Sequence, residues 1–155
     1  MDLKRFDGVV VDARKREATV GAGVIGERME RALNAVGFSA GHFPSSLYCS
    51  TVGGWAAARS AGQLSSRYGK IEDMILSLAA VDGAGRHLHA GKNDVVDLLR
   101  TLIGSEGTLA VITRITVRIQ PLASHRVLFG LAAPNVDSGL TLMRQVMQSG
   151  LRPAV

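Results

Sequence analysis

The sequence predicts an α+β fold in which helices flank a largely antiparallel sheet. Short β-branched runs come in neighbouring pairs, as at residues 8–12 and 17–22. Between the pairs lie segments whose apolar residues recur at helical spacing, as at residues 25–36. The longest alternating strand, residues 109–120, comes late in the chain and ends at Pro121. Strands arranged mainly as hairpins, with interspersed helices, favour an antiparallel sheet.

The first predicted hairpin joins residues 8–12 to residues 17–22, with the basic cluster 14–16 between them. Eighteen Lys and Arg against thirteen Asp and Glu give a formal net charge of +5, so nucleic acid has to be considered as a partner. No aromatic residues are interleaved with the cluster for base stacking. We therefore interpret it as a solvated hairpin tip and expect no nucleic-acid partner.

Three helices are predicted from apolar residues spaced three and four apart. The first is expected to pack on the sheet and to have Gly37 as its C′ residue. The second is expected to begin with Asn93 as N-cap and to end at Gly104, and the third to close at Gly150. Their apolar faces are formed by Ile25, Met29, Leu33 and Val36, by Val95, Leu98, Leu99, Leu102 and Ile103, and by Leu140, Met143, Val146 and Met147.

The remaining strands are predicted in the second half of the chain. Residues 74–82 form a buried strand, and a glycine-containing turn leads into a short strand at residues 86–90. Another strand is expected at residues 127–133. The apolar set of the long strand at residues 109–120 is Leu109, Val111, Thr113, Ile115, Val117 and Ile119.

We expect two parts, residues 1–123 and residues 124–155. At 155 residues the chain is large enough to bury a core of its own, and we expect one domain plus an appendage. The second part offers one strand, one helix and the start of another strand, which cannot bury both faces by themselves. It is therefore expected to be loosely attached or covered by a second copy of the chain, which makes a homodimer possible.

The sequence predicts neither a metal site nor a membrane segment. No apolar run approaches the roughly 20 residues that span a bilayer, and the four histidines have no metal-ligand spacing. His42 either faces the ligand or has a hydrogen-bonded structural role. The single Cys49 is expected to be a buried packing residue, and because it cannot form an internal disulfide we expect a cytoplasmic protein.

The stretch of residues 41–73 is the candidate ligand site. Gly53 and Gly54 follow two hydroxylated residues, Ser50 and Thr51, and precede a helix-forming run. A backbone without Cβ atoms lets a ligand approach closely, and the N–H groups of a helix's first turn favour an anion. The pattern predicts a phosphate-bearing cofactor held largely by main chain. Close packing of the helix start on a strand is the alternative explanation for the glycine pair.

Four strings carry a resemblance to a known family: PSSLYCSTVGGW, RSAG, SSRYGKIEDM and GSEGTLAVIT, which begin at residues 44, 59, 65 and 104. Together they resemble the FAD-binding domain of the vanillyl-alcohol oxidase type. The motifs are closest to the alkyldihydroxyacetonephosphate synthase branch and bacterial FAD-linked oxidases. The resemblance covers almost the whole chain. It implies a second FAD-binding subdomain followed by the first β-α-β elements of a cap domain, as a fragment of a larger flavoenzyme.

The resemblance implies FAD as the cofactor and gives each string a place along it. Residues 44–50 would line the isoalloxazine and ribityl region, residues 51–54 the diphosphate, residues 60–62 the flavin side and residues 106–112 the adenosine end. The implied FAD-binding residues are Pro44, Ser45, Ser46, Ser50, Thr51, Val52, Gly53, Gly54, Ser60, Gly62, Tyr68, Gly69, Glu106, Gly107, Thr108 and Ile112.

The same resemblance implies the FAD-binding portion of a flavin-dependent oxidoreductase that is not catalytically complete alone. We expect no catalytic residue in this chain and a small-molecule substrate for the full-length protein. The chain departs from the family pattern at Ser45, where an acidic residue is usual, and at Ala110, where a glycine is usual. The alternatives are a fragment of a D-lactate or glycolate type 2-hydroxy-acid dehydrogenase, or a binding module that keeps the fold without turnover.

Overall fold

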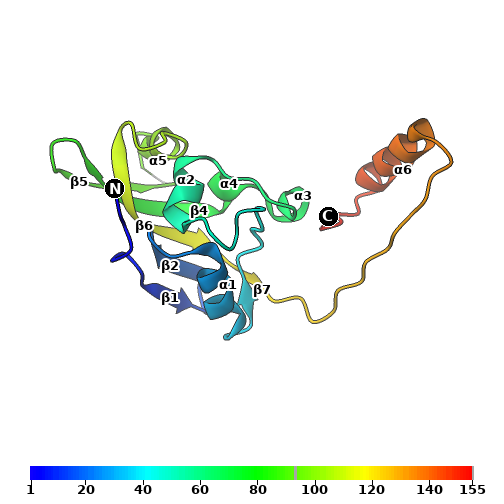
Figure 1. Cartoon of the computed structure of the whole chain (residues 1–155), viewed down its shortest axis with the longest axis horizontal. Coiled ribbons are helices and arrows are strands. Elements are labelled where there is room, and N and C mark those ends of the chain that lie inside the picture. Colours follow the sequence, from blue (N-terminus) through cyan, green and yellow to red (C-terminus); the bar gives the residue numbers. More distant parts are fainter. Residues whose placement is uncertain (93, 155) are drawn as a thin grey trace.

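The computed structural model describes residues 1–92 and 94–154 and has the predicted α+β architecture (Figure 1). A five-stranded sheet has the order β1-β2-β6-β4-β5, and each neighbouring pair is antiparallel. A two-stranded sheet pairs β3 with β7. The strands are β1 (Val9–Asp12), β2 (Glu17–Gly21), β3 (Phe38–Ser39), β4 (Ile75–Asp82), β5 (His87–Gly91), β6 (Ala110–Arg118) and β7 (Gln120–Pro121).

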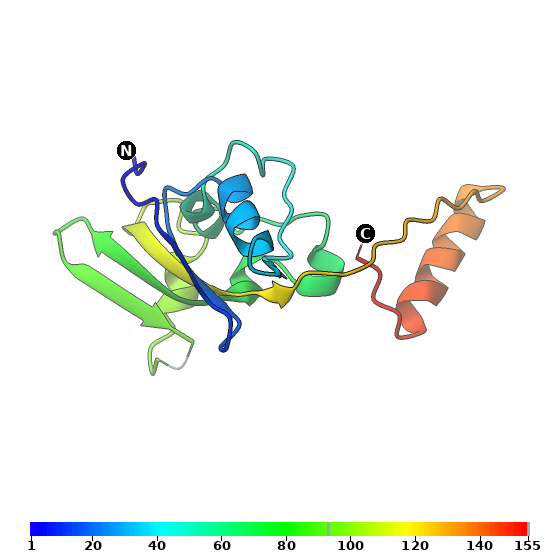
Figure 2. The same cartoon turned by 90° about the horizontal axis from the view of Figure 1, so that it is seen from below.

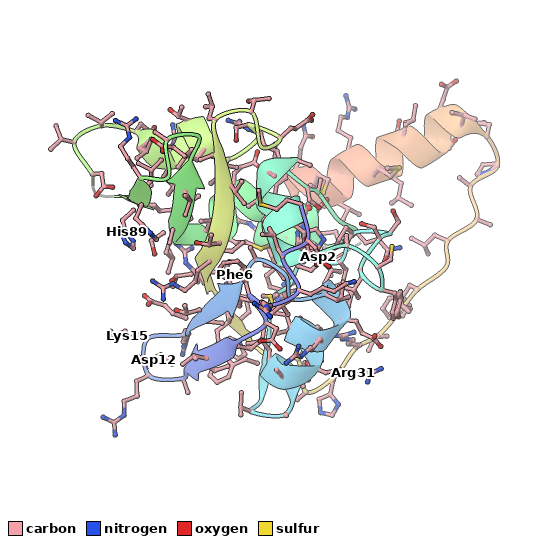
Figure 3. All side chains as sticks on the ribbon, turned by 60° about the vertical axis from the view of Figure 1, so that its left-hand side comes forward. Asp2, Phe6, Asp12, Lys15, Arg31 and His89 are labelled. Atoms are coloured by element: carbon pink, nitrogen blue, oxygen red, sulfur yellow. The ribbon has the colours of Figure 1, made fainter. Side chains whose placement is uncertain are left out.

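Helices cover one face of the five-stranded sheet (Figure 2). On that face Val20, Ile115, Leu78 and Ala90 form a row of paired core residues across β2, β6, β4 and β5. The other face carries polar side chains such as His89, which Figure 3 shows on the side remote from α1. The helices that precede residue 110 are α1 (Gly26–Asn34), α2 (Val52–Ala57), α3 (Ser65–Tyr68), α4 (Ile71–Met74) and α5 (Leu98–Leu102).

Both predicted hairpins are confirmed. The first joins β1 to β2, and Figure 3 shows Asp12 and Lys15 at its tip. The second joins β4 to β5. Its turn is held by Asp82, whose carboxylate accepts hydrogen bonds from the backbone N–H groups of Ala84 and Arg86.

The buried set of β6 changes phase at Thr113. Buried side chains occupy even positions up to Ile112 and odd positions from Ile115 onward. Ile112 and Arg114 pair with adjacent residues of β4, which leaves Thr113 as the extra residue of a β-bulge. The predicted apolar set, which counted Leu109 and Thr113 with Ile115, is therefore wrong for the first half of the strand.

Helix α5 begins later than predicted. Its N-cap is Asp97, whose carboxylate accepts a hydrogen bond from the backbone N–H of Arg100 at 3.1 Å. The predicted cap, Asn93, lies outside the described residues. Val95 is fully exposed and does not belong to the buried face. The predicted face of α1 is likewise too long, because the helix ends at Asn34 and Val36 is 53% exposed.

Helix α6 (Val136–Gln148) stands apart from the rest of the molecule (Figures 1 and 2). It confirms the third predicted helix, and the Asn135 side chain caps it by accepting a hydrogen bond from Ser138 N at 2.8 Å. The strand predicted at residues 127–133 is wrong, because among the described residues no strand pairs with that segment. None of the described residues after 119 is buried. Within the described ranges, no helix is both long and apolar enough to cross a membrane.

Candidate functional site

Helix α2 lies at the centre of the candidate site, and its N-terminal turn is hydrogen-bonded to the residues that follow β2. Thr51 is the N-cap, and its Oγ1 accepts a hydrogen bond from Gly54 N at 3.1 Å. Val52 N and Gly53 N donate to two carbonyl oxygens just beyond β2, at 2.8 and 2.9 Å. The first-turn N–H groups that we expected to receive a phosphate are therefore already paired within the protein.

The two glycines of α2 have different environments. Gly53 is buried, and a Cβ atom there would lie 2.6 Å from Ala22 Cβ and 2.8 Å from Ala22 O. Gly54 is exposed, and a Cβ there would meet only Thr51 Oγ1, at 3.1 Å. Close packing, the alternative raised for the pair, thus accounts for Gly53. Gly54 leaves the backbone of the helix accessible to a ligand.

The loop before α2 is held by a hydroxyl network around Trp55. Trp55 Nε1 donates to Ser50 Oγ at 2.6 Å, and Ser50 Oγ in turn donates to Ser46 O at 2.7 Å. Trp55 packs against Gly26 of α1, where a Cβ would lie 2.1 Å from the indole ring. Cys49 in this loop is exposed, so its prediction as a buried packing residue is wrong.

Residues 60–62 lie against residues 42–44. A Cβ at Gly62 would lie 2.7 Å from Pro44 N, so only glycine allows this approach. Ser60 Oγ and His42 Nε2 are hydrogen-bonded at 3.0 Å. Two predicted site segments, which are separated in the sequence by α2, are therefore in direct contact.

His42 is buried and neutral near pH 7. It is 1% exposed and its ring meets Trp55 edge-on, with centroids 4.9 Å apart. Burial lowers the pKa of His42 to about 4, although the nearby Glu72 carboxylate partly opposes this shift. Its bond to Ser60 gives it the hydrogen-bonded structural role that was one of the two expected alternatives.

Tyr68 and Gly69 lie at the far end of the same segment. The Tyr68 ring covers Gly41, where a Cβ would lie 2.8 Å from it, and Arg67 lies 5.4 Å from the ring centroid. Gly69 has φ +88° and leads into α4. The Tyr68 side chain is half-buried, so part of it is open to a ligand.

The turn at residues 104–108 lies against the other end of α2. Gly104 N donates to Ala56 O at 2.9 Å, and Glu106 N donates to Ala57 O at 3.0 Å. Glu106, Gly107 and Thr108 are all exposed. A Cβ at Gly107 would meet nothing within 4 Å. This part of the predicted adenosine end therefore has an open outer surface.

The first residues of β6 follow this turn and are paired on one side. Residues 110–112 pair with β4, whereas the ladder between β2 and β6 stops at the Gly21–Arg114 pair. In the part of the chain that the structure describes, no strand pairs with the other side of residues 110–112. Ile112 itself is buried, with only 5% of its surface exposed.

The predicted segments at residues 44–51, 60–62 and 104–108 thus lie around α2. A family described as "FAD binding domain" matches residues 1–91. The chain belongs to this family. An alkyldihydroxyacetonephosphate synthase of Caenorhabditis elegans is 32% identical, and the match covers 99% of this chain and 27% of that protein. An uncharacterized FAD-linked oxidoreductase of Escherichia coli, YgcU, is 35% identical, and the match covers 94% of this chain and 31% of that protein. A solved alkyldihydroxyacetonephosphate synthase structure matches with a TM-score of 0.83 and 31% identity over 96% of the chain and 27% of that protein.

The protein is thus a FAD-binding domain of the FAD-linked oxidases, and FAD is its cofactor. It spans about a quarter to a third of the length of the curated relatives it matches. Gly54 and the turn at residues 106–108 are exposed and would accommodate FAD, whereas Ala110 and Ile112 are each only 5% exposed. Among the described residues, no group of three or more His, Cys, Asp and Glu is placed to hold a metal.

Two residues that shape this FAD-binding domain were missed in the sequence. Glu30 is buried, accepting hydrogen bonds from Ser39 Oγ at 2.6 Å and Ala40 N at 3.0 Å, and so directs the chain toward His42. Its signal was available, because Glu30 lies on the apolar face of α1. The second residue, Arg59, binds a segment more than 40 positions away, and no local pattern signals that contact.

Proposed function

We propose that this chain forms one wall of the FAD site of a flavin-dependent oxidoreductase related to alkyldihydroxyacetonephosphate synthase. The observation that supports the proposal is the convergence of residues 44–51, 60–62 and 104–108 on α2, through hydrogen bonds and glycine contacts. When bound, the flavin supplies the redox chemistry, and the protein supplies binding and orientation.

The proposed contacts are assigned by exposure. Ser45, Gly54, Glu106, Gly107 and Thr108 are exposed and offer side-chain or main-chain contacts to the cofactor. The other proposed site residues are at least half-buried, and they contribute main chain, partly open side chains or support: Pro44, Ser46, Ser50, Thr51, Val52, Gly53, Ser60, Gly62, Tyr68, Gly69 and Ile112. Because the first-turn N–H groups of α2 are paired internally, we propose that Gly54 contributes an unobstructed surface instead of an anion cradle.

We further propose that turnover of a small-molecule substrate belongs to the whole protein, and that the protein is cytoplasmic. We place a domain boundary between residues 123 and 124, since no described residue beyond it is buried. The remainder of the protein or a second copy of the chain would cover the apolar side chains of the last part. These include Phe129, Leu140, Met143 and Met147, which are 55% to 82% exposed.

Calorimetric titration of the chain with FAD tests the proposal. We expect saturable binding, weaker than about 1 µM, because few charge-assisted contacts are available on this wall. Gly54→Val should abolish that binding by occupying the open surface of α2. Gly83→Val is the matched control, because Gly83 is exposed in a distant turn and a Cβ there meets nothing within 4 Å. Unchanged FAD binding by Gly54→Val would remove Gly54 from the site, and the absence of saturable binding by the unsubstituted chain would contradict the proposal.

A flavin-reduction assay on the FAD-loaded whole protein separates the alternatives. Bleaching of the flavin absorbance by D-lactate or glycolate would favour a 2-hydroxy-acid dehydrogenase. Bleaching by neither acid, with formation of an alkyldihydroxyacetonephosphate, would favour the alkyldihydroxyacetonephosphate synthase reaction. FAD binding without turnover of either kind would favour a binding module.

A further inference from the structure

We infer that Arg59 is a positioning residue, which fixes the turn at residues 104–108 against α2 and so sets the adenosine side of the FAD site. This inference rests on the proposed function. Both segments contain residues proposed to contact FAD, although more than 40 positions separate them in the sequence. The Arg59 side chain follows α2 and bonds to the backbone immediately before the turn, at Arg100 and Ile103.

The Arg59 side chain donates to two carbonyl oxygens at the end of α5. Its Nε donates to Ile103 O and its Nη2 to Arg100 O, each at 3.1 Å. The last carbonyl groups of a helix have no intrahelical partner and form the negative end of its dipole. A guanidinium group, which presents several donors in a fixed fork, is suited to bind two of them at once.

Gly104 makes room for this side chain. A Cβ at Gly104 would lie 2.3 Å from Arg59 Nε and 2.7 Å from Arg59 Cδ. Gly104 also has φ +83°, a conformation that side-chain-bearing residues rarely adopt. The glycine that ends α5 therefore allows both the turn and the close approach of Arg59.

The backbone on both sides of this contact is in an uncommon conformation. Arg59 has φ +50° and Glu106 has φ +52°, although neither is a glycine. Such conformations cost free energy and persist where the surrounding contacts fix them. Here the surrounding contacts are the two Arg59 bonds and the main-chain bonds from Gly104 to Ala56 and from Glu106 to Ala57.

The outer side of the turn has little other support. Glu106, Gly107 and Thr108 are exposed, and the hydroxyl of Thr108 bonds only within the turn, to Ser105 O at 2.6 Å. The position of the turn is therefore determined from its inner side, where Arg59 lies. Without the two Arg59 hydrogen bonds, the turn should exchange between its position against α2 and a displaced position.

Arg59→Asn is the informative substitution, because asparagine tolerates a positive φ and removes only the fork. Its matched control is Arg16→Asn, since Arg16 has φ +57° and is exposed at the tip of the first hairpin. Hydrogen exchange of the Gly104 and Glu106 amides is measured on the chain without FAD. In Arg59→Asn both amides should exchange about tenfold faster, as expected from the loss of roughly one net hydrogen bond. Amides of the β2–β6 ladder and all amides of Arg16→Asn outside the hairpin tip should be unchanged.

Titrations with FAD and FMN then test the link to the cofactor. FMN lacks the adenosine half of FAD, so its affinity should not change in Arg59→Asn, whereas FAD should bind about tenfold more weakly. Arg59→Lys, which can reach one carbonyl but not both, should restore part of the loss. Unchanged exchange at Gly104 and Glu106, or an equal loss of FAD and FMN affinity, would overturn the inference. If the unsubstituted chain does not bind FAD, the proposed function fails, and the exchange data alone then report on the contact.

Discussion

Alanine at Gly53 should destabilise the protein by about 2 kcal/mol. The new methyl group would lie 2.6 Å from Ala22 Cβ and 2.8 Å from Ala22 O, so α2 or the end of β2 has to move. Overpacking of this kind costs about 1–3 kcal/mol. Movement of α2 would also weaken the hydrogen bond from Gly53 N to Ala22 O, at 2.9 Å, and its loss would cost about 1 kcal/mol more. The better helix propensity of alanine offsets about 1 kcal/mol of this loss.

The same substitution at the adjacent Gly54 should change stability by no more than about 0.5 kcal/mol. Its methyl group meets only Thr51 Oγ1, at 3.1 Å, and a slightly weakened cap is balanced by helix propensity. Urea denaturation followed by circular dichroism gives both free energies of unfolding. FAD titration of the folded variants should show weaker binding for Gly54→Ala, whose methyl group lies on the exposed surface of α2. A Gly53→Ala variant as stable as the parent, or a Gly54→Ala variant less stable than Gly53→Ala, would refute this division between packing and ligand contact.

Two further predictions concern the last helix and the buried histidine. A chain ending at residue 123 should have the same free energy of unfolding as the full chain to within about 0.5 kcal/mol, because no described residue beyond that point is buried. A loss of several times that size in urea denaturation would contradict the domain boundary. The free energy of unfolding should fall by about 3 kcal/mol between pH 7 and pH 4, because the pKa of His42 is lowered from 6.5 to about 4 in the folded protein. In that pH range His42 binds a proton in the unfolded chain but stays neutral in the folded chain, so protonation favours unfolding. His42→Gln should remove this part of the pH dependence, and an unchanged slope would contradict it.

The strands of the five-stranded sheet and the two longest helices could be predicted because their signals are local. The β1–β2 and β4–β5 hairpins follow from β-branched runs with turns between them, and α1 and α6 from apolar spacing. The bulge at Thr113 could not be predicted, because an alternating pattern does not reveal where the partner strand skips a residue. The strand expected at residues 127–133 failed for a related reason, since a strand needs a partner and β propensity alone does not supply one.

The candidate site was predicted as a set of segments and not as a set of contacts. The glycines of α2 were recognised, but the sequence could not say that Gly53 packs on Ala22 while Gly54 is open, because Ala22 is about 30 positions away. The exposure of Cys49 was missed because its neighbours are small and apolar, and the sequence could not say that Leu47 is the residue by which this loop enters the core while Cys49 faces outward. His42 could be named but not assigned a role until its bond to Ser60 was visible.

The position of β6 in the middle of the sheet has a consequence for synthesis of the protein. Thr19 of β2 and Thr116 of β6 face each other with their hydroxyl oxygens 3.1 Å apart, but they are 97 residues apart in the chain. During translation the β1–β2 hairpin emerges before β6, so the edge of β2 that pairs with β6 stays unpaired until β6 appears. At about 5–20 residues per second this delay lasts roughly 5–20 s. Throughout that time the unpaired edge of β2 is open to pairing with another chain, so we expect nascent chains to aggregate more readily than the folded protein.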